Sequence, residues 1–261
     1  EEDEAAANAA REVLKGLEIA RAEIRHESLL KTPRSILENE LPGSRISNVG
    51  RRGKYIRIEL SEGWILWLHL GMTGRLSFEA PGSPAGPHAH FLLFFLNSDK
   101  ALVYRDPRRF GKIALSRLEE GSFPKGVARL GPEPKEWRPE IFARAFKERQ
   151  GRIKSLLLNQ TLMAGLGNIY ADESLHRAGI HPLARPHRLS QDRLMRLHEA
   201  ICRVLKEAIE MGGSSVDNYR HLDGGLGRFQ KYHRVYGRQG EKCPACSGVI
   251  RKIVISARSA S

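Results

Sequence analysis

The spacing of apolar residues changes once along the chain, from a two-residue to a helical period, and this change predicts two kinds of structure. Residues 3–17 are rich in alanine and place Val13, Leu14 and Leu17 on one side, which predicts a leading helix. From about residue 22 to residue 118, short apolar runs alternate with turn-forming residues, as in antiparallel strands. We expect a β-sandwich or barrel there, with strands at residues 44–49, 55–60, 64–70, 75–78, 91–95 and 101–105.

A segment rich in glycine and proline, residues 121–139, separates this region from a helical one. Helices are predicted at residues 139–149, 152–159, 168–178 and 190–211. The last stretch, residues 232–261, is short, basic and strand-like. The fold class is therefore α+β, with a β-sandwich over residues 1–125, a helical domain over 126–230 and a small β-hairpin over 231–261.

The charge of the chain adds a class of partner to this picture. Lys and Arg number 43 against 30 Asp and Glu, so the net charge is +13. A surplus of this size favours a polyanion such as nucleic acid, because phosphate neutralisation releases counterions. The alternative is a basic protein without such a partner. No apolar run has the length of a membrane span, and neither an export region nor a disulfide framework is visible, so we expect a reducing, intracellular setting.

Two motifs have the chemistry of nucleic-acid contacts. Residues 163–173 contain a glycine-bearing turn followed by Asn168 at the start of a predicted helix, where free N–H groups can bind phosphate. A tight turn between helices that only pack is the alternative. Residues 104–111 read Tyr-Arg-Asp-Pro-Arg-Arg-Phe-Gly, so Phe110 follows two arginines. Such an aromatic can wedge between bases while the arginines bind phosphate or an unpaired base; a solvated turn with Phe110 in the core is the alternative.

Three further positions are candidates with simpler alternatives. Lys54 precedes a predicted strand and can contact phosphate or transfer a proton, although a single lysine is more often only a surface residue. Met72 lies in a glycine-rich turn after His69, although a lone methionine is more often a core gap-filler. Cys243 and Cys246 supply half of a tetrahedral zinc site, which needs four ligands, and His233 is a conceivable third.

In this order along residues 11–258, these motifs resemble those of the formamidopyrimidine-DNA glycosylase/endonuclease VIII superfamily, and more closely its first branch. The resemblance implies an N-terminal β-sandwich, a C-terminal helix–two-turn–helix domain and a terminal zinc-finger-like hairpin, with DNA across the cleft between the domains. It also implies that the damaged nucleotide is flipped out of the duplex, because its glycosidic carbon is unreachable inside the base stack.

The resemblance also implies residue roles. Lys54 matches a lysine that aids strand cleavage and contacts phosphate, and Arg258 matches the hairpin arginine that holds the phosphates beside the lesion. Met72, Arg108 and Phe110 match the trio that fills the gap left by the flipped nucleotide, with Arg108 pairing to the orphaned cytosine. Residues 214–230 resemble the loop that covers the flipped base. Other DNA contacts are implied for His69, His88, Lys154, Asn168, Tyr236 and Lys252.

The family's chemistry begins at an N-terminal proline, whose nitrogen attacks C1′ to form a Schiff base with help from an adjacent glutamate. In the register set by Lys54, that Pro-Glu pair and one further residue would precede Glu1, and the second zinc Cys pair would follow Ser261. The prediction of catalysis is therefore conditional on a Pro-Glu ahead of Glu1.

We therefore predict a monomeric base-excision glycosylase/AP lyase that removes oxidised purines, such as 8-oxoguanine and formamidopyrimidines, from double-stranded DNA. Its predicted cofactor is zinc, and no membrane partner is expected. The main alternative is a lesion- or abasic-site-binding protein on the same scaffold without chemistry. A basic RNA- or ribosome-binding protein is a third hypothesis, but it does not explain why Lys54, Met72, Arg108 and Phe110 occur in this order.

Overall fold

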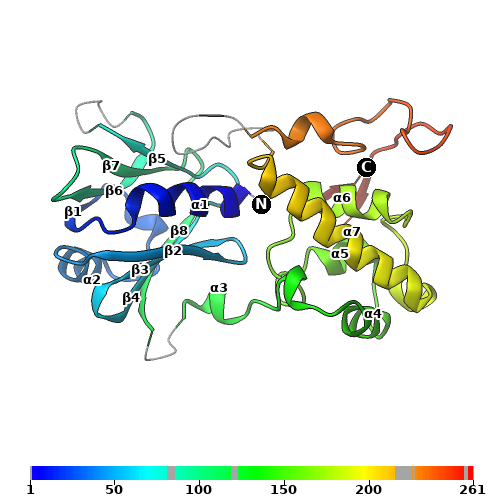
Figure 1. Cartoon of the computed structure of the whole chain (residues 1–261), viewed down its shortest axis with the longest axis horizontal. Coiled ribbons are helices and arrows are strands. Elements are labelled where there is room, and N and C mark those ends of the chain that lie inside the picture. Colours follow the sequence, from blue (N-terminus) through cyan, green and yellow to red (C-terminus); the bar gives the residue numbers. More distant parts are fainter. Residues whose placement is uncertain are drawn as a thin grey trace. The chain divides into compact units, whose positions relative to one another are not determined.

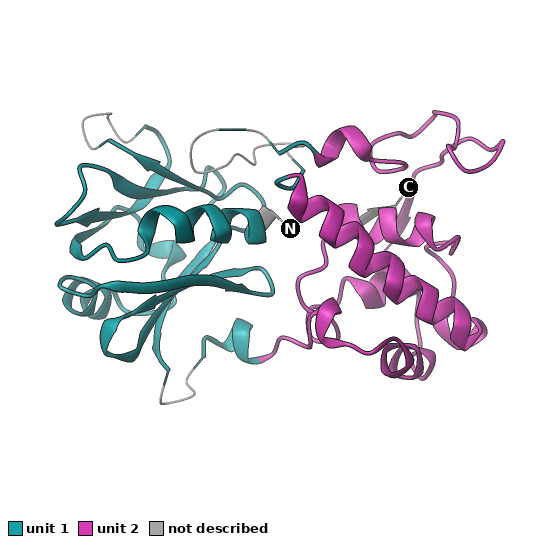
Figure 2. Ribbon diagram, in the orientation of Figure 1, with its two compact units in different colours: residues 1–128, 212–228 teal, residues 129–211, 229–261 magenta. Residues whose placement is uncertain are grey.

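The computed structural model describes residues 2–80, 86–118, 123–214, 225, 227–255 and 258–260, with side chains between residues 3 and 255 of those ranges. The chain forms two compact units (Figure 2). Unit 1 comprises Glu1–Ala128 and Gly212–Arg228, and unit 2 comprises Arg129–Met211 and Phe229–Ser261. After residue 211, the chain thus contributes residues 212–228 to unit 1 and residues 229–261 to unit 2. The predicted division into three domains, with the hairpin on its own, stays a prediction.

Unit 1 is a sandwich of two four-stranded sheets in which every strand pairing is antiparallel (Figure 1). One sheet has the order β1-β6-β7-β5 and the other the order β2-β3-β4-β8. Their inward-facing side chains form a single apolar core, so the predicted sandwich is confirmed. The strands are β1 (Ile19–Ile24), β2 (Ile46–Arg52), β3 (Tyr55–Leu60), β4 (Trp64–His69), β5 (Arg75–Glu79), β6 (Ala89–Phe95), β7 (Ala101–Arg105) and β8 (Lys112–Arg117).

The leading helix α1 (Glu2–Leu14) packs against β2 and β3 through small side chains. Its buried face contains Ala6, Ala7, Ala10 and Leu14, whereas Val13 is 38% exposed. The predicted apolar side was therefore right for Leu14 and for Leu17, which packs against the same core, and wrong for Val13. The helix also ends earlier than predicted, since Gly16 has a φ of 88° and its N–H pairs with Ile46 O.

Three regular elements of unit 1 were not among the predicted ones: β1, β8 and the seven-residue helix α2 (Arg34–Glu40). In β1, a register shift between Ile19 and Arg21 breaks the alternation, so that Ile19 and Ile24 both reach the core despite their odd spacing. Shorter turns complete the unit, namely α3 (Lys125–Ala128), η1 (Glu27–Leu29) and η2 (Ser61–Gly63).

Unit 2 is built on four helices that agree with the predicted ones to within two residues at each end. They are α4 (Pro139–Lys147), α5 (Ile153–Leu157), α6 (Asn168–Arg177) and α7 (Gln191–Glu210). The short helix η3 (Pro134–Glu136) precedes α4, η4 (Pro186–Arg188) lies between α6 and α7, and η5 (Phe229–Tyr232) follows α7. Helix α7 begins where the Ser190 hydroxyl accepts the Arg193 N–H. Apolar faces of α4, α6 and α7 share one core, in which the rings of Phe142 and Phe146 stack at 4.2 Å.

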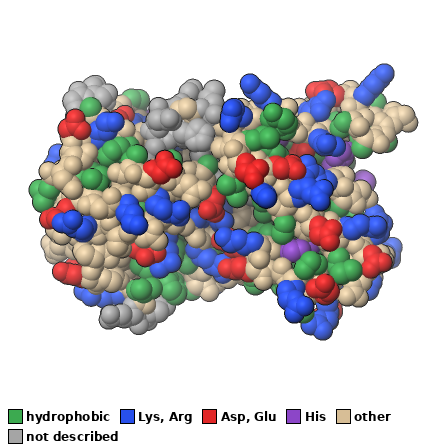
Figure 3. All heavy atoms as spheres, in the orientation of Figure 1, with side chains coloured by type: hydrophobic (Ala, Val, Ile, Leu, Met, Phe, Trp, Pro, Cys, Tyr) green, Lys and Arg blue, Asp and Glu red, His purple; other side chains and the backbone are tan. Residues whose placement is uncertain are grey.

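The end of the chain adds a two-stranded antiparallel hairpin, β9 (Ile253–Ile255) with β10 (Arg258–Ala260). Within the described residues, no helix has both the length and the apolar character needed to cross a membrane. On the face shown in Figure 3, Lys and Arg side chains lie on both units among scattered acidic ones.

Candidate nucleic-acid interface

Unit 1 brings Met72, Arg108 and Phe110 together at its surface, although the first lies 36 residues before the second. Met72 is 71% exposed and Phe110 is 50% exposed. The Arg108 guanidinium lies 4.5 Å from the centre of the Phe110 ring, and its Nη1 lies 3.9 Å from the Met72 sulfur. These exposures exclude the alternatives of a core Phe110 and a gap-filling Met72. We call these three residues the recognition trio.

A buried carboxylate lies beneath the trio. Asp106 has no exposed surface, and its side chain accepts the N–H groups of Arg108, at 3.2 Å, and Gly111, at 2.8 Å. It also accepts the hydroxyl of Thr73 from the neighbouring turn. Buried carboxylates are stable only when hydrogen bonds replace lost water, so these donors are what allow Asp106 to remain inside. Neither Asp106 nor Thr73 was a predicted site residue.

Three glycines in the two turns that carry the trio lie where a Cβ would be too close to neighbouring atoms. Gly71 has a φ of 67°, and a Cβ there would lie 3.1 Å from the Gly111 nitrogen. A Cβ on Gly74 would lie 2.1 Å from Leu70 O, and one on Gly111 would lie 1.6 Å from the Tyr104 hydroxyl. Gly71 thus serves the contact between the two turns, whereas Gly74 and Gly111 allow close approach to Leu70 O and to the Tyr104 hydroxyl.

His69 and Lys54 lie close to one another beside this region. His69 is the last residue of β4, and its ring lies 4.8 Å from that of Tyr55, which follows Lys54. Burial lowers the pKa of His69, and the charges of Lys112 and Lys54 lower it further, whereas Asp3 and Asp106 raise it. The imidazole is therefore held largely neutral at pH 7, with its Nδ1 accepting the Gly71 N–H.

His88 lies at the surface and contacts the backbone of Asp106. It is exposed, has a φ of 70°, and its carbonyl accepts the Asp106 N–H. His90 packs 6.4 Å from it and bonds to Asp106 O. The backbone of Asp106 thus fixes the start of β6 as well as the turn that follows β7.

In unit 2, Asn168 and Lys154 occupy different environments. Asn168 begins α6, and its buried Oδ1 has no hydrogen-bond partner in the described part of the chain. Lys154 is enclosed: its ammonium lies 2.6 Å from Asp172 Oδ1, and both side chains are 1% exposed. A phosphate contact at Lys154 stays a prediction, while the geometry gives this residue the role of neutralising Asp172 within the helical core.

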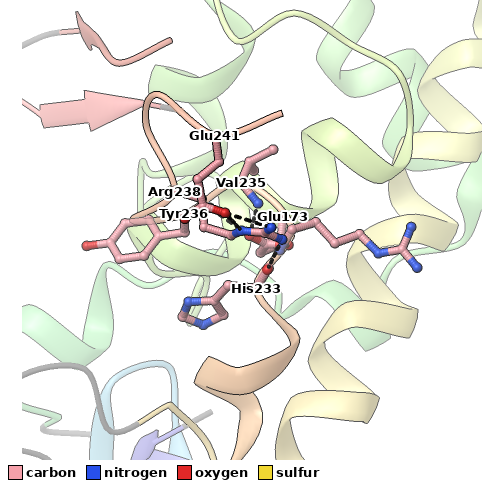
Figure 4. A network of polar contacts seen from close by, with 7 residues as sticks. Glu173, His233, Val235, Tyr236, Arg238 and Glu241 are labelled. Atoms are coloured by element: carbon pink, nitrogen blue, oxygen red, sulfur yellow. Dashed lines mark hydrogen bonds and ion pairs between the residues drawn. The ribbon is translucent and has the colours of Figure 1, made fainter. Parts of the chain in front are cut away.

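Tyr236 belongs to a segment that one glutamate of α6 holds in place (Figure 4). The carboxylate of Glu173, only 4% exposed, accepts the N–H groups of Arg234, Val235 and Tyr236 at 2.9 to 3.0 Å. Farther along, Arg238 bonds to His233 O and to Glu241. The pattern around Tyr236 did not identify Glu173, since 61 residues separate the helix from the segment.

The surroundings of Cys243 and Cys246 bear on whether these cysteines can bind zinc. A hydrogen bond from the Ala245 N–H, with a further one to His176, lowers the pKa of Cys243 to about 6. This favours the thiolate that metals bind. His176 Nε2 lies 3.5 Å from the Cys243 sulfur, whereas His233 packs against Phe229 and Tyr236. Within the described residues, no group of three metal-ligating side chains occurs, so the zinc hairpin is not confirmed.

The remaining predicted residues lie toward the C-terminus. Lys252 is exposed, just before β9. Arg258 begins β10, opposite Ile255, but its side chain is outside what the structure describes. Most of the predicted capping loop, residues 214–230, is likewise outside the described residues.

Comparison with known proteins covers both units. Residues 1–113 match the formamidopyrimidine-DNA glycosylase N-terminal domain, and residues 130–220 match the formamidopyrimidine-DNA glycosylase H2TH domain. The formamidopyrimidine-DNA glycosylase of Solibacter usitatus is 46% identical over 247 residues, which cover 94% of this chain and 90% of the relative. That of Chloroflexus aggregans is 42% identical over 219 residues, covering 83% and 78%.

Solved structures agree with the sequence matches. The Lactococcus lactis enzyme in complex with Fapy-dG-containing DNA aligns with a TM-score of 0.93 at 34% identity, covering 99% of this chain and 95% of the neighbour. A complex of the same enzyme with DNA containing an abasic site aligns with a TM-score of 0.91, at the same identity and coverage.

These similarities, together with the sandwich of unit 1, define a DNA glycosylase with a helix–two-turn–helix domain. The chain belongs to the formamidopyrimidine-DNA glycosylase family. The predicted class, a DNA glycosylase/AP lyase of base-excision repair, is confirmed, and the alternative of a binder without chemistry is not favoured.

Proposed function

We propose that this enzyme removes oxidised purines, 8-oxoguanine and formamidopyrimidines, from double-stranded DNA and then cuts the strand. The observation that carries the proposal is the recognition trio, three exposed side chains held at one point of unit 1. Phe110 and Met72 have the size and apolar character to occupy the space of an extruded nucleotide. Arg108 presents planar donors that suit the exposed edge of cytosine.

Flipping of the damaged nucleotide out of the duplex explains the roles that we propose for Lys54 and His69. Lys54 is half-buried beside His69, so its ammonium is positioned to contact a phosphate of the lesion strand and to assist elimination. The neutral His69 is suited to hydrogen bonding with that strand. An amine attacks C1′ as the bond to the base breaks, the imine forms when the sugar opens, and elimination then releases the 3′ phosphate.

Unit 2 supplies the phosphate contacts that position the duplex in this proposal. The N-terminus of α6 at Asn168 and the Tyr236 segment held by Glu173 offer donors on a fixed framework. Exposed Lys252 adds positive charge, and His88 of unit 1 adds a further contact. Arg258 is proposed to hold the phosphates that flank the lesion, and the enzyme is proposed to act intracellularly as a monomer.

Zinc is proposed as a structural metal, with Cys243 and Cys246 as two of its four ligands. The lowered pKa of Cys243 supports this, because zinc binds the thiolate. Metal analysis of the full chain is expected to give one zinc per molecule, and Cys243→Ser is expected to lose it. Equal zinc content in the two proteins would contradict the assignment, independently of any activity.

Borohydride trapping on a duplex with 8-oxoguanine opposite cytosine tests the proposed reaction in the full chain. Reduction of the imine is expected to give a covalent protein–DNA adduct with the damaged duplex and none with its undamaged counterpart. Tight binding to the damaged duplex without an adduct or strand cleavage would contradict the proposal and favour a binder without chemistry.

A further inference from the structure

The recognition trio comes from two separate turns of unit 1. Residues 70–74, between β4 and β5, carry Met72, and residues 106–111, between β7 and β8, carry Arg108 and Phe110. The contacts within the trio itself are weak, because a guanidinium over a ring and a long sulfur contact between exposed groups compete with water. The relative position of the two turns must therefore be fixed beneath the surface.

The side chain of Asp106 joins the two turns. Its Oδ1 accepts the Arg108 N–H of its own turn and the Thr73 hydroxyl of the other, and its Oδ2 accepts the Gly111 N–H. The Thr73 hydroxyl thus links the turn of Met72 to the turn of Arg108 beneath the exposed trio. Because Asp106 is fully buried, losing a donor there is far less tolerable than losing one in water.

The backbone of the second turn depends on Asp106 as well. Arg109 has a φ of 55°, a conformation that is unfavourable for a residue with a side chain, and its N–H bonds to Asp106 O at 3.1 Å. Its guanidinium also contacts the ring of His26. This fixed reversal lies between Arg108 and Phe110, whose side chains stack on one another.

We propose that Thr73 and Asp106 form a positioning pair that fixes Met72 relative to Arg108 and thereby determines selectivity for the base opposite the lesion. The inference rests on the proposed function, in which Arg108 meets the orphaned base while Met72 and Phe110 fill the gap. Because the side chains of the recognition trio are already ordered, binding does not have to include the free-energy cost of ordering them. Neither Thr73 nor Asp106 contacts DNA in this proposal; both act through the trio.

Thr73→Val tests the link with little change in shape, because it replaces only the hydroxyl by a methyl group. The measurement is equilibrium binding to duplexes carrying a tetrahydrofuran abasic-site analogue opposite cytosine or adenine, with plain duplex as reference. The cytosine-to-adenine affinity ratio is expected to fall about tenfold, the scale of one hydrogen bond to a charged group. Plain-duplex affinity is expected to stay within about twofold, since phosphate contacts set it.

Thr32→Val is the matched control. The Thr32 hydroxyl is partly buried in the same unit, where it donates to Leu115 O at 3.2 Å and accepts the Leu115 N–H at 2.9 Å. This control is expected to keep the wild-type ratio. Thr73→Ser restores a hydroxyl and is expected to rescue the ratio, which a purely structural loss at position 73 would not predict. Asp106→Asn is expected to lose more than Thr73→Val, provided that thermal unfolding shows it folds.

The outcomes separate the inference from the proposed function. A cytosine-to-adenine affinity ratio near one in the wild-type protein would overturn both the positioning pair and the proposed function. A wild-type protein that discriminates, together with a Thr73→Val protein of equal ratio, would overturn the positioning pair alone. An equal loss of affinity for all duplexes in Thr73→Val would also overturn it, because a selectivity role requires that plain-duplex binding be spared.

Discussion

Each unit contains a buried carboxylate that accepts several backbone N–H groups, but the two act over different distances along the chain. Asp106 of unit 1 accepts N–H groups only two and five residues ahead, and adds one hydroxyl from Thr73. Glu173 of unit 2 reaches from α6 to three consecutive N–H groups, of residues 234–236, more than 60 residues later. One carboxylate shapes its own turn, whereas the other attaches a distant segment to a helix.

This difference bears on the two surfaces that we propose bind DNA. In unit 1 the exposed side chains Arg108 and Phe110 need exact directions, and a carboxylate within their own turn sets those directions. In unit 2, Glu173 attaches the segment that carries Tyr236 to the helical core by accepting its backbone N–H. Loss of Asp106 should therefore affect recognition, whereas loss of Glu173 should affect the stability of unit 2.

Glu173→Gln gives the largest expected effect. The substitution replaces a carboxylate by a neutral amide whose NH₂ group would face backbone donors in a buried site. Hydrogen bonds to charged groups contribute about 1.5–3 kcal/mol each, so we expect a loss of roughly 3–5 kcal/mol in the free energy of unfolding, measured by denaturant titration. Glu241→Gln, whose exposed partner is Arg238, is the control and should change stability by less than about 0.5 kcal/mol. A similar loss in both variants would contradict the role of Glu173.

Gly111→Ala tests the close approach of Gly111 to Tyr104 of β7 in unit 1. The new Cβ would lie 1.6 Å from the hydroxyl of Tyr104, which is fully buried and cannot move aside. Overpacking of this kind costs up to about 3 kcal/mol, and thermal unfolding measures it. Gly50→Ala is the control, because its Cβ would have only the Arg11 guanidinium within 4 Å, at 3.9 Å. Equal stability of the Gly111→Ala and wild-type proteins would contradict the described contact.

Histidines of both units should make stability depend on pH in the same direction. Burial lowers the pKa of His69 and His90 in unit 1 and of His233 in unit 2 below the ordinary value of 6.5. The unfolded chain therefore binds protons more readily, so stability is full above pH 6.5 and declines as the pH falls toward the folded-state pKa values. His69→Asn should make this decline shallower when unfolding is followed at several pH values. A steeper loss of stability with falling pH in His69→Asn would contradict a lowered pKa of His69 in the folded protein.

Lys252→Ala gives the smallest expected effect. The exposed lysine contributes one phosphate contact in our proposal, so the slope of log affinity against log salt should fall by about one unit. Lys206→Ala on α7, with a side chain that is 77% exposed, is the control and should leave the slope unchanged. Equal slopes for Lys252→Ala and wild type would remove Lys252 from the interface.

Local chemistry explains what the sequence could and could not predict. The strand Tyr55–Leu60 was predicted to the residue because its alternation is regular and turn formers bound it. The strand Ile19–Ile24 was missed because its bulge hides the alternation. The motif around Arg108 and Phe110 pointed to their exposure, whereas the role of Met72 came only from the family resemblance. The hydrogen bond between Thr73 and Asp106 beneath them depends on a strand pairing that the sequence does not display. Glu173 was missed because its partners are backbone groups, which leave no trace in residue type.

The central claim is that the recognition trio reads the base opposite the lesion from a fixed position on unit 1. The most direct measurement is the affinity of Arg108→Ala for tetrahydrofuran-containing duplexes with cytosine or adenine opposite the analogue. The preference for cytosine is expected to fall by about tenfold or more, within the roughly 1–3 kcal/mol of one bidentate base contact, while plain-duplex affinity stays nearly unchanged. An unchanged preference for cytosine, or an equal loss for every duplex, would contradict it.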